Sequence, residues 1–550
     1  MHRQTKPLHW LIVGGQQIYP AVNPLWLLLR AGEIELDAVT VLGIADAGRL
    51  EACGQVLQEI LAAHGAPLQV RLVADGGGAP QLFAAALASL LKECARQQQQ
   101  VVLQLCDDIP AHCSALAAQA AAHQPQVEVI CLLCNVPRYA GVPLALAPRA
   151  AHRLVRVEDG ELRQLPIKFT GPAPVEAAAG RHGWQLPADR LMFLVNGLMD
   201  LGYDRNLSLR LPLLKNLPLC RLHFPGEQVQ VGHFPARKEY TQWLQQCARP
   251  LRSAARRQIP DYSQLVEICY AAGLLKPSGL TRLSEELSVI GARGLNAGGD
   301  VYHIALDTNL LRDRFFSTCL RQMPMPANVD YVLCETVRSE LFNRQGKVDD
   351  ALLNDLKPLA GDLARELFFN QNQLEDRLRY VGLLEFNRMR SATGCREQDS
   401  ASAPSSARND RFILDAYSSF VEVGCKVLFL SRDQETVRMM RGEEGVAALL
   451  LEHREQPGEA FPVEWPLLCD WLYLLAVVYG RLEWVVGGTP VAVVDGVWAG
   501  KTVQQWEEDF VRVRLPRPRS PDELSEHRRL AAWIQQDATL MQAVTVTAVQ

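Results

Sequence analysis

The sequence predicts a mixed α/β protein in which parallel sheets are flanked by helices. Short apolar runs alternate with helical patterns from residue 8 to about 135, and a second series of apolar runs ending near acidic residues lies between about 300 and 455. Strands and helices that alternate through short connections build doubly wound parallel sheets. The composition, 48% apolar and 21% charged, is globular, and 550 residues are too many for one ordinary core.

Four segments are expected along the chain. They are a Rossmann-like sheet domain over residues 1–140, a connector over 141–298, a second α/β domain with a three-layer α/β/α arrangement over 299–455, and an extension of a hairpin and a helix over 456–550.

The first segment has a regular alternation of elements. Strands are predicted at Trp10–Val13, Ala38–Ile44, Gln69–Val73, Val101–Leu105 and Val127–Leu133, with helical patterns that include Val56–Ala63 and Leu82–Ala95. Two glycines follow the first strand, which permits a tight turn and close approach of the backbone to a ligand. The helix after them would present its N-terminal N–H groups to an anion. With the loop after the fourth strand, the predicted ligand-binding residues are Gly14, Gly15, Gln16, Gln17, Asp107 and Asp108.

The connector is rich in Pro and Gly and is harder to interpret. Asp159-Gly160 is a hairpin signal between two strand-like pieces. Helices are expected at Tyr262–Ala272 and Ser278–Ile290. A winged-helix arrangement and a plain helical connector both remain open for this pair.

Four acidic residues follow or open elements of the second α/β segment. The stretch VYHIALDTN ends a buried strand at Asp307; Glu340 lies in ETVRSEL, Asp410 opens the NDRFIL helix, and Asp433 follows the strand in KVLFLSRD. A carboxylate at the C-terminal end of a parallel strand is at the usual place for chemistry. Several acids with no partnered bases suit a hard divalent cation, so Asp307, Glu340, Asp410 and Asp433 are predicted to hold Mg²⁺ or Mn²⁺.

Helix geometry separates these acids from two neighbours. Glu335 and Glu340 are five residues apart and point about 140° apart on a helix, so only one can face the site. Glu340 fits the apolar rhythm, and Glu335 suits the first helical turn. The same argument selects Asp410 over Asp415. Supporting roles are predicted for Asn309, which would hold the Asp307 carboxylate, and for Ser431, which would orient a metal-bound water. The arginines beside two of the acids, predicted to contact phosphate, are Arg408, Arg411 and Arg432.

These residues resemble the motif set of PIN-domain nucleases over residues of about 300–455. The resemblance rests on D-T-N after the first strand, the E-T-V-x-x-E-L helix, the N-D-x-x-I-L helix and the strand that ends in S-R-D. It implies a metal-dependent endoribonuclease with the four acids as catalytic residues and single-stranded RNA as the substrate. Nothing in the residues themselves excludes DNA.

The first segment resembles a CARF domain, the Rossmann-like sensor of cyclic oligoadenylate in type III CRISPR defence systems. The resemblance implies a homodimer whose loops after the first and fourth strands line the ligand pocket, and a nuclease that the ligand activates. The chain departs from the family at the second loop, where Asp107 and Asp108 replace a Gly-Thr-Lys-like element and would repel a polyphosphate. A Rossmann-like domain that serves only dimerisation or scaffolding is the alternative.

Charge and cysteine usage limit the remaining possibilities. The net charge of -5 means that a nucleic-acid binder must rely on local basic patches. The fourteen cysteines show no metal or disulfide framework, which predicts buried thiols in a reducing cytoplasm. No membrane segment is predicted, because the longest apolar run, Trp465–Tyr479, contains Asp470 and is short for a bilayer. Two further alternatives are a constitutive or toxin-like PIN nuclease whose N-terminal domain mediates assembly, and a non-catalytic regulator.

The last segment is Trp-rich. Two apolar runs around Gly487-Gly488 predict a hairpin, and Ser520–Ala543 has a helical pattern expected to pack on the body or on a partner subunit.

Overall fold

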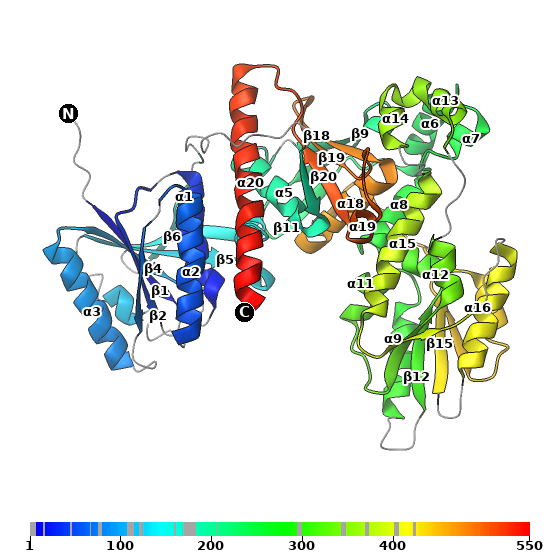
Figure 1. Ribbon diagram of the computed structural model, residues 1–550, viewed down its shortest axis with the longest axis horizontal. Coiled ribbons are helices and arrows are strands. Elements are labelled where there is room, and N and C mark those ends of the chain that lie inside the picture. The colour runs from blue at the N-terminus through cyan, green and yellow to red at the C-terminus, as the bar shows by residue number, and fades with distance from the viewer. Residues whose placement is uncertain are drawn as a thin grey trace.

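A computed structural model describes residues 7–549 except 15–16, 33, 44–46, 67, 75–79, 107–114, 120–123, 125, 159–160, 168, 170–182, 206, 294–299, 343–347, 369–372, 401–405 and 422–424. The strands within these residues form three sheets, of seven, eight and five strands, which lie side by side along the longest axis of the molecule (Figure 1). Two of the sheets are built on parallel strands, so the predicted mixed α/β class is confirmed.

The first sheet has the strand order β3-β2-β1-β4-β5-β6-β7. β1 to β5 pair in parallel, while β6 and β7 are added in antiparallel. The predicted strands and helices of this segment are confirmed. The turn at Asp159-Gly160 lies outside the described residues, but the pairing of Glu158 with Glu161 on either side of it is that of a hairpin. The elements are β1 (Leu8–Gly14), α1 (Ile18–Ala31), β2 (Ala38–Gly43), α2 (Ala47–Ala63), β3 (Val70–Ala74), α3 (Pro80–Arg96), β4 (Gln100–Leu105), β5 (Val127–Cys134), β6 (His152–Glu158) and β7 (Glu161–Gln164).

The second sheet combines the predicted connector with the predicted C-terminal extension. Its order is β17-β11-β10-β9-β18-β19-β20-β8, with every neighbouring pair antiparallel. The hairpin predicted around Gly487-Gly488 is confirmed, and both glycines adopt positive φ angles in its turn. The two segments expected to be separate therefore form one structural unit. The strands are β8 (Trp184–Pro187), β9 (Leu207–Leu211), β10 (Leu217–His223), β11 (Gln228–Gly232), β17 (Phe461–Glu464), β18 (Arg481–Val486), β19 (Thr489–Asp495) and β20 (Phe510–Arg514).

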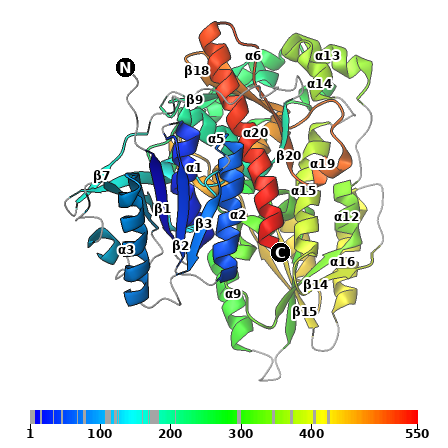
Figure 2. The same cartoon turned by 60° about the vertical axis from the view of Figure 1, so that its left-hand side comes forward.

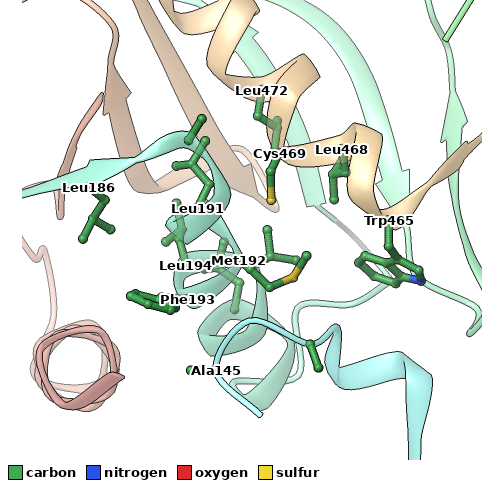
Figure 3. Close-up of a cluster of buried hydrophobic side chains, with 14 of the residues drawn as sticks. Ala145, Leu186, Leu191, Met192, Phe193, Leu194, Trp465, Leu468, Cys469 and Leu472 are labelled. Carbon is green, nitrogen blue, oxygen red and sulfur yellow. The ribbon is translucent and has the colours of Figure 1, made fainter. Parts of the chain in front are cut away.

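Two apolar helices fill the core beside this sheet. Helix α5 (Leu191–Asp200) and helix α18 (Trp465–Tyr479) are almost entirely buried. Figure 3 shows Leu191, Met192 and Leu194 of α5 gathered with Leu468 and Cys469 of α18. Helix α18 is thus apolar on all sides because it is a core helix. In the described part of the chain, no helix combines the length and apolar composition that a membrane span requires.

The third sheet contains five parallel strands in the order β14-β13-β12-β15-β16. Its strands are β12 (Val301–Leu306), β13 (Val329–Cys334), β14 (Cys395–Gln398), β15 (Cys425–Ser431) and β16 (Val446–Leu450). The apolar, almost fully buried sequences of the central strand β12 and of its neighbour β15 are typical of strands that are covered on both faces. The helices of this body are α10 (Thr308–Arg312), α11 (Phe315–Thr318), α12 (Glu335–Phe342), α16 (Ser406–Phe420) and α17 (Gln434–Met440). Helix α15 (Leu374–Arg390) contributes buried residues both to this body and to the core of the second sheet, where α13 (Asp350–Ala360) and α14 (Leu363–Leu367) pack.

The buried apolar residues divide into two clusters. One extends through the first and second sheets, and the other surrounds the third sheet. Helix α8 (Tyr262–Ala271) belongs to the first cluster, whereas α9 (Leu280–Ala292) belongs to the second. Both predicted helices of the connector are present, and their separate cores fit a helical connector better than a winged helix. Three further helices lie near the second sheet: α6 (Arg237–Ala248), α7 (Ser253–Arg256) and α19 (Val503–Glu507).

The C-terminal helix joins the first sheet to the second. Helix α20 (Pro521–Val549) packs on α2 and on α5 (Figures 1 and 2), as predicted for the helical pattern at Ser520–Ala543. Arg30 of α1 is buried there between two carboxylates, with its Nε 2.8 Å from Asp200 and its Nη1 2.5 Å from Asp537. Arg149 reaches the other oxygen of Asp200 at 2.9 Å. Buried charges are tolerated only when they are paired, so this network fixes α1, α5 and α20 to one another.

Candidate metal and nucleic-acid site

The acidic site lies where the strand order of the third sheet reverses. The chain proceeds from β12 outwards to β13 and β14, then returns to the other side of β12 to form β15 and β16. Loops that leave the carboxyl ends of β12 and β15 therefore diverge and open a crevice, which is where open α/β sheets bind ligands. Asp307 follows β12 directly, and Asp433 lies two residues beyond β15. The register pairs Leu306 with Leu430, which brings these two strand ends together.

Asp307 is held rigidly by its neighbours. Its Oδ1 accepts the Thr308 N–H at 2.7 Å, as expected for the N-cap of α10. Its Oδ2 accepts the Asn309 amide at 2.6 Å and the Ser431 hydroxyl at 2.5 Å. The predicted role of Asn309 as a holder of Asp307 matches this geometry, and the Ser431 hydroxyl donates to the same oxygen.

Glu340 extends toward the site from α12. Its Oε2 accepts the hydroxyl of Thr308, and its Oε1 accepts the amide of Asn409 at 2.9 Å. Asn409 is buried, with 4% of its surface exposed, although it precedes Asp410 on α16. Glu340 is therefore fixed between the helix that follows Asp307 and the helix that carries Asp410.

Asp433 caps helix α17 by accepting the N–H groups of Glu435 and Thr436 at 2.7 and 3.1 Å. Its own N–H donates to the Ser431 hydroxyl at 2.8 Å, which ties it to the residue that contacts Asp307. Asp410 lies on the fifth residue of α16 and is partly buried. The two carboxylates come from different helices, yet each lies within the electrostatic reach of the other.

The pKa shifts in the site come from burial first and from neighbouring negative charges second. The pKa of the Asp307 carboxyl is raised to about 6, chiefly by burial and to a smaller extent by the charges of Glu340 and Asp410, against the lowering effect of its hydrogen bonds. The pKa of Asp410 is raised first by burial and then by the negative charges of Glu340, Asp433 and Glu435. Like charges that cannot neutralise one another favour protonation. The four predicted acids thus share one electrostatic environment.

The oxygen donors of the four acids suit a divalent cation in their chemistry. Among the residues that the structure describes, none of the four acids takes part in an ion pair, and all their donor atoms are carboxylate oxygens, which suit Mg²⁺ and Mn²⁺. Within the same residues, no three acidic, histidine or cysteine side chains close into a ready-made metal cage. The chemistry and the uncompensated charge fit a divalent cation, and the carboxylates would have to draw together around it.

The three predicted phosphate-contacting arginines have different environments. Arg411 is exposed on α16 next to Asp410. Arg408 lies on the same helix, but its side chain is outside the described residues. Arg432 differs from the expectation, because its guanidinium lies 2.9 Å from the carboxylate of Asp313 and 3.4 Å from that of Glu267.

The two acids that helix geometry set aside lie apart from the predicted site. Glu335 begins α12 and pairs with Arg338 at 3.3 Å, while Asp415 is exposed further along α16. Three residues that lie against these acids were not predicted from the sequence: Thr308, Asn409 and Glu435. The first two were present in the D-T-N and N-D motifs, but their hydrogen bonds to Glu340 join segments that are distant in sequence.

The first sheet also reverses its order, between β1 and β4. Gly14 ends β1, and Gln17 precedes α1 without a side-chain capping bond, so the first N–H groups of α1 face the loop side of the sheet. Gly141 permits a close approach here, because a Cβ at that position would lie 2.7 Å from Oε1 of Gln17. The other predicted ligand-binding residues, Gly15, Gln16, Asp107 and Asp108, lie outside the described residues.

Comparison of the chain with models of known protein families and with curated proteins finds no match.

The raised pKa of Asp307 predicts a pH dependence of stability in metal-free protein. The folded state keeps the proton on Asp307 to higher pH than the unfolded chain does. The contribution of this proton to the free energy of unfolding is therefore complete below about pH 4 and is lost as the pH rises through about 6. A shift of about two pKa units corresponds to about 3 kcal/mol. Asp307→Asn should therefore show a smaller fall in melting temperature between pH 5 and pH 7 than the wild type, as measured by circular dichroism in a chelator. Parallel pH profiles of the two proteins would contradict this.

Proposed function

We propose that this chain is a metal-dependent endoribonuclease that hydrolyses phosphodiester bonds in RNA, with Asp307, Glu340, Asp410 and Asp433 as the acids that hold Mg²⁺ or Mn²⁺. The observation that carries the proposal is the gathering of these acids at the switch point of a parallel sheet, with no ion pair to any of them among the described residues. Keeping such carboxylates together costs free energy, and a bound cation would offset that cost. Groups with perturbed pKa values in such crevices are functional candidates.

Each part of the site then has a distinct role. Asn309 and Ser431 orient the carboxylate of Asp307, and Thr308 and Asn409 orient that of Glu340. When bound, a divalent cation supplies Lewis acidity, an activated water and charge stabilisation of the leaving oxygen. The arginines are assigned according to their surroundings: Arg411 is exposed beside Asp410 and is proposed to contact a substrate phosphate. Arg408 keeps the same proposed role.

Single-stranded RNA is proposed as the substrate because the motif set resembles that of PIN-domain nucleases. The five-stranded parallel sheet supports the resemblance at the level of architecture, with D-T-N and S-R-D at the ends of adjacent strands.

The N-terminal domain is proposed to be a CARF-like sensor that binds cyclic oligoadenylate in a homodimer and activates the nuclease as part of a type III CRISPR defence system. The reversal of strand order between β1 and β4 and the start of α1 just beyond the end of β1 support an anionic ligand there. The buried network of Arg30, Asp200 and Asp537 gives this domain a firm connection to the second sheet. A ligand can shift the nuclease only if it binds two states with different affinity.

A cleavage assay tests the proposal. The full chain is incubated with end-labelled single-stranded RNA or DNA, in Mg²⁺, in Mn²⁺ or in EDTA, with and without cyclic tetra- or hexa-adenylate. RNA cleavage that requires the metal and increases with a cyclic adenylate is expected. Metal-dependent cleavage of equal rate with and without those ligands would instead favour a constitutive nuclease whose N-terminal domain mediates assembly. The absence of cleavage in every condition would contradict the nuclease assignment.

A further inference from the structure

Arg432 occupies an unusual position, between the two site residues Ser431 and Asp433. Its side chain does not remain with the third sheet alone. Besides Asp313, the C-cap of α10, it reaches Glu267 of α8, where Nη1 donates to Oε1 at 3.4 Å. Helix α8 packs in the apolar cluster of the first and second sheets. One side chain of the acidic loop is thus anchored in the neighbouring body.

A histidine completes this contact. Nη1 of Arg432 lies 2.7 Å from Nδ1 of His453, and Nε2 of His453 lies 3.0 Å from Asp313. A guanidinium can only donate, so Nδ1 accepts and the ring proton is placed on Nε2, facing the carboxylate. The imidazole also stacks on Tyr270 of α8, with ring centroids 3.6 Å apart and planes 4° apart. Arg432 is therefore positioned by groups from both bodies.

This contact lies where the chain passes between the bodies. Glu452 forms an isolated bridge with Ser278 in the α8–α9 connection. The hydroxyl of Tyr270 donates to the carbonyl of Glu455 and accepts its N–H, at 3.0 and 2.8 Å. Lys276 donates to the carbonyl of Thr318 at 2.8 Å. The two segments that connect the bodies are thus hydrogen-bonded close to the partners of Arg432. A change in how the bodies dock would therefore move this side chain.

The backbone of Arg432 transmits its position to the acids. Its N–H donates to Oδ1 of Asn309 at 3.1 Å, and the amide of Asn309 donates to Asp307 at 2.6 Å. Asp433 is the next residue, and its N–H is held by Ser431. A shift of Arg432 would therefore disturb the support of Asp307 and the direction of Asp433 together.

We propose that Glu267, on a helix outside the nuclease body, is a positioning residue for the acidic site and acts through Arg432. The inference rests on the proposed nuclease function and deepens it: docking of the second-sheet body on the nuclease body sets the geometry of Asp307 and Asp433. Arg432 is suited to this role because its Nη1 contacts both Glu267 and His453 while its Nε lies beside the carboxylate of Asp313, a spread of contacts that the compact ammonium of a lysine does not reproduce. Asp313 is 6% exposed, so its charge depends on keeping Arg432 in place.

The test compares Glu267→Gln with Asp509→Asn in the full chain. Asp509 pairs with Arg388 of α15 at 2.7 Å and joins the same two bodies, but it has no connection to Arg432. Loss of a supporting group costs about 10–100-fold in activity. We expect kcat for RNA cleavage to fall about tenfold in Glu267→Gln with an unchanged KM, a similar fall in Arg432→Lys, and no change in Asp509→Asn.

Hydrogen exchange provides a readout that does not depend on activity. In metal-free protein, the peptide that contains residues 431–433 should exchange faster in Glu267→Gln than in the wild type, whereas Asp509→Asn should not alter it. Arg432→Lys gives the same comparison should Glu267→Gln fail to fold. The inference would be overturned if the wild type cleaves RNA and Glu267→Gln matches it both in kcat and in the hydrogen exchange of this peptide. If the wild type cleaves no RNA, the proposed function is overturned instead, and the hydrogen-exchange comparison still tests whether Glu267 positions residues 431–433.

Discussion

Replacing Asp307 with Asn should lower kcat for RNA cleavage by about three orders of magnitude. Asp307 is the most buried of the four acids and is oriented by three hydrogen bonds, so it is the donor with the least freedom to be replaced by another side chain. Metal assistance contributes several kcal/mol of transition-state stabilisation, and each 1.36 kcal/mol corresponds to about a tenfold change in rate. Single-turnover cleavage of a labelled RNA in saturating Mn²⁺ measures the effect.

Asp415→Asn is the matched control for this substitution. It removes one acid from the body of the third sheet, but Asp415 is exposed on the part of α16 beyond Asp410. Its cleavage rate should equal that of the wild type. If Asp307→Asn retained the wild-type rate, the acids at the end of β12 would not be the catalytic centre.

Replacing Asp200 with Ala should destabilise the junction of the first and second sheets by about 3–5 kcal/mol, because it removes a partner from the buried Arg30 and Arg149. At about 2–4 °C per kcal/mol for a unit of 150–250 residues, the melting temperature should fall by roughly 10 °C. Asp537 alone cannot replace the lost partner, since it reaches Arg30 from α20 and Arg149 only at longer range. Scanning calorimetry would show the shift.

The control for this prediction is Asp204→Ala. Asp204 pairs with Arg205 at 3.8 Å, where the Arg205 side chain is 81% exposed, and exposed pairs contribute about 0–1 kcal/mol. A melting temperature for Asp200→Ala within a degree of the Asp204→Ala value would mean that the buried network does not hold α1 and α5 together.

The features that could be predicted from the sequence are those set by local pattern, namely individual strands, helices and contacts between neighbouring residues. Apolar runs and helical periodicity located the parallel strands of the first sheet and strands β12 and β15 of the third, and the acid after β12 could be placed at a carboxyl edge because parallel strands align their ends. Helical geometry also showed that only one of Glu335 and Glu340 could face the site, and the apolar rhythm and the resemblance to the family motif favoured Glu340. Asn309 could be linked to Asp307 because the two are neighbours on one turn.

Contacts between distant segments could not be predicted in the same way. Strands β11 and β17 pair although more than two hundred residues separate them, and short alternating strands carry no signal of which edges will meet. The connector and the extension were therefore expected to be separate. Arg432 was expected to face phosphate because it neighbours Asp433 in sequence, but its charge is satisfied by Glu267 and Asp313, which only the tertiary fold brings near.

The most direct test of the account is the binding of Mn²⁺ to the full chain, measured by the loss of the free-ion signal in electron paramagnetic resonance at pH 7.5. The account predicts that the wild type and Asp415→Asn bind Mn²⁺ alike, and that Asp307→Asn and Glu340→Gln bind it at least about tenfold more weakly, as loss of a ligand requires. Equal affinity in all four proteins, or no binding by the wild type, would contradict the claim that these carboxylates converge on a cation.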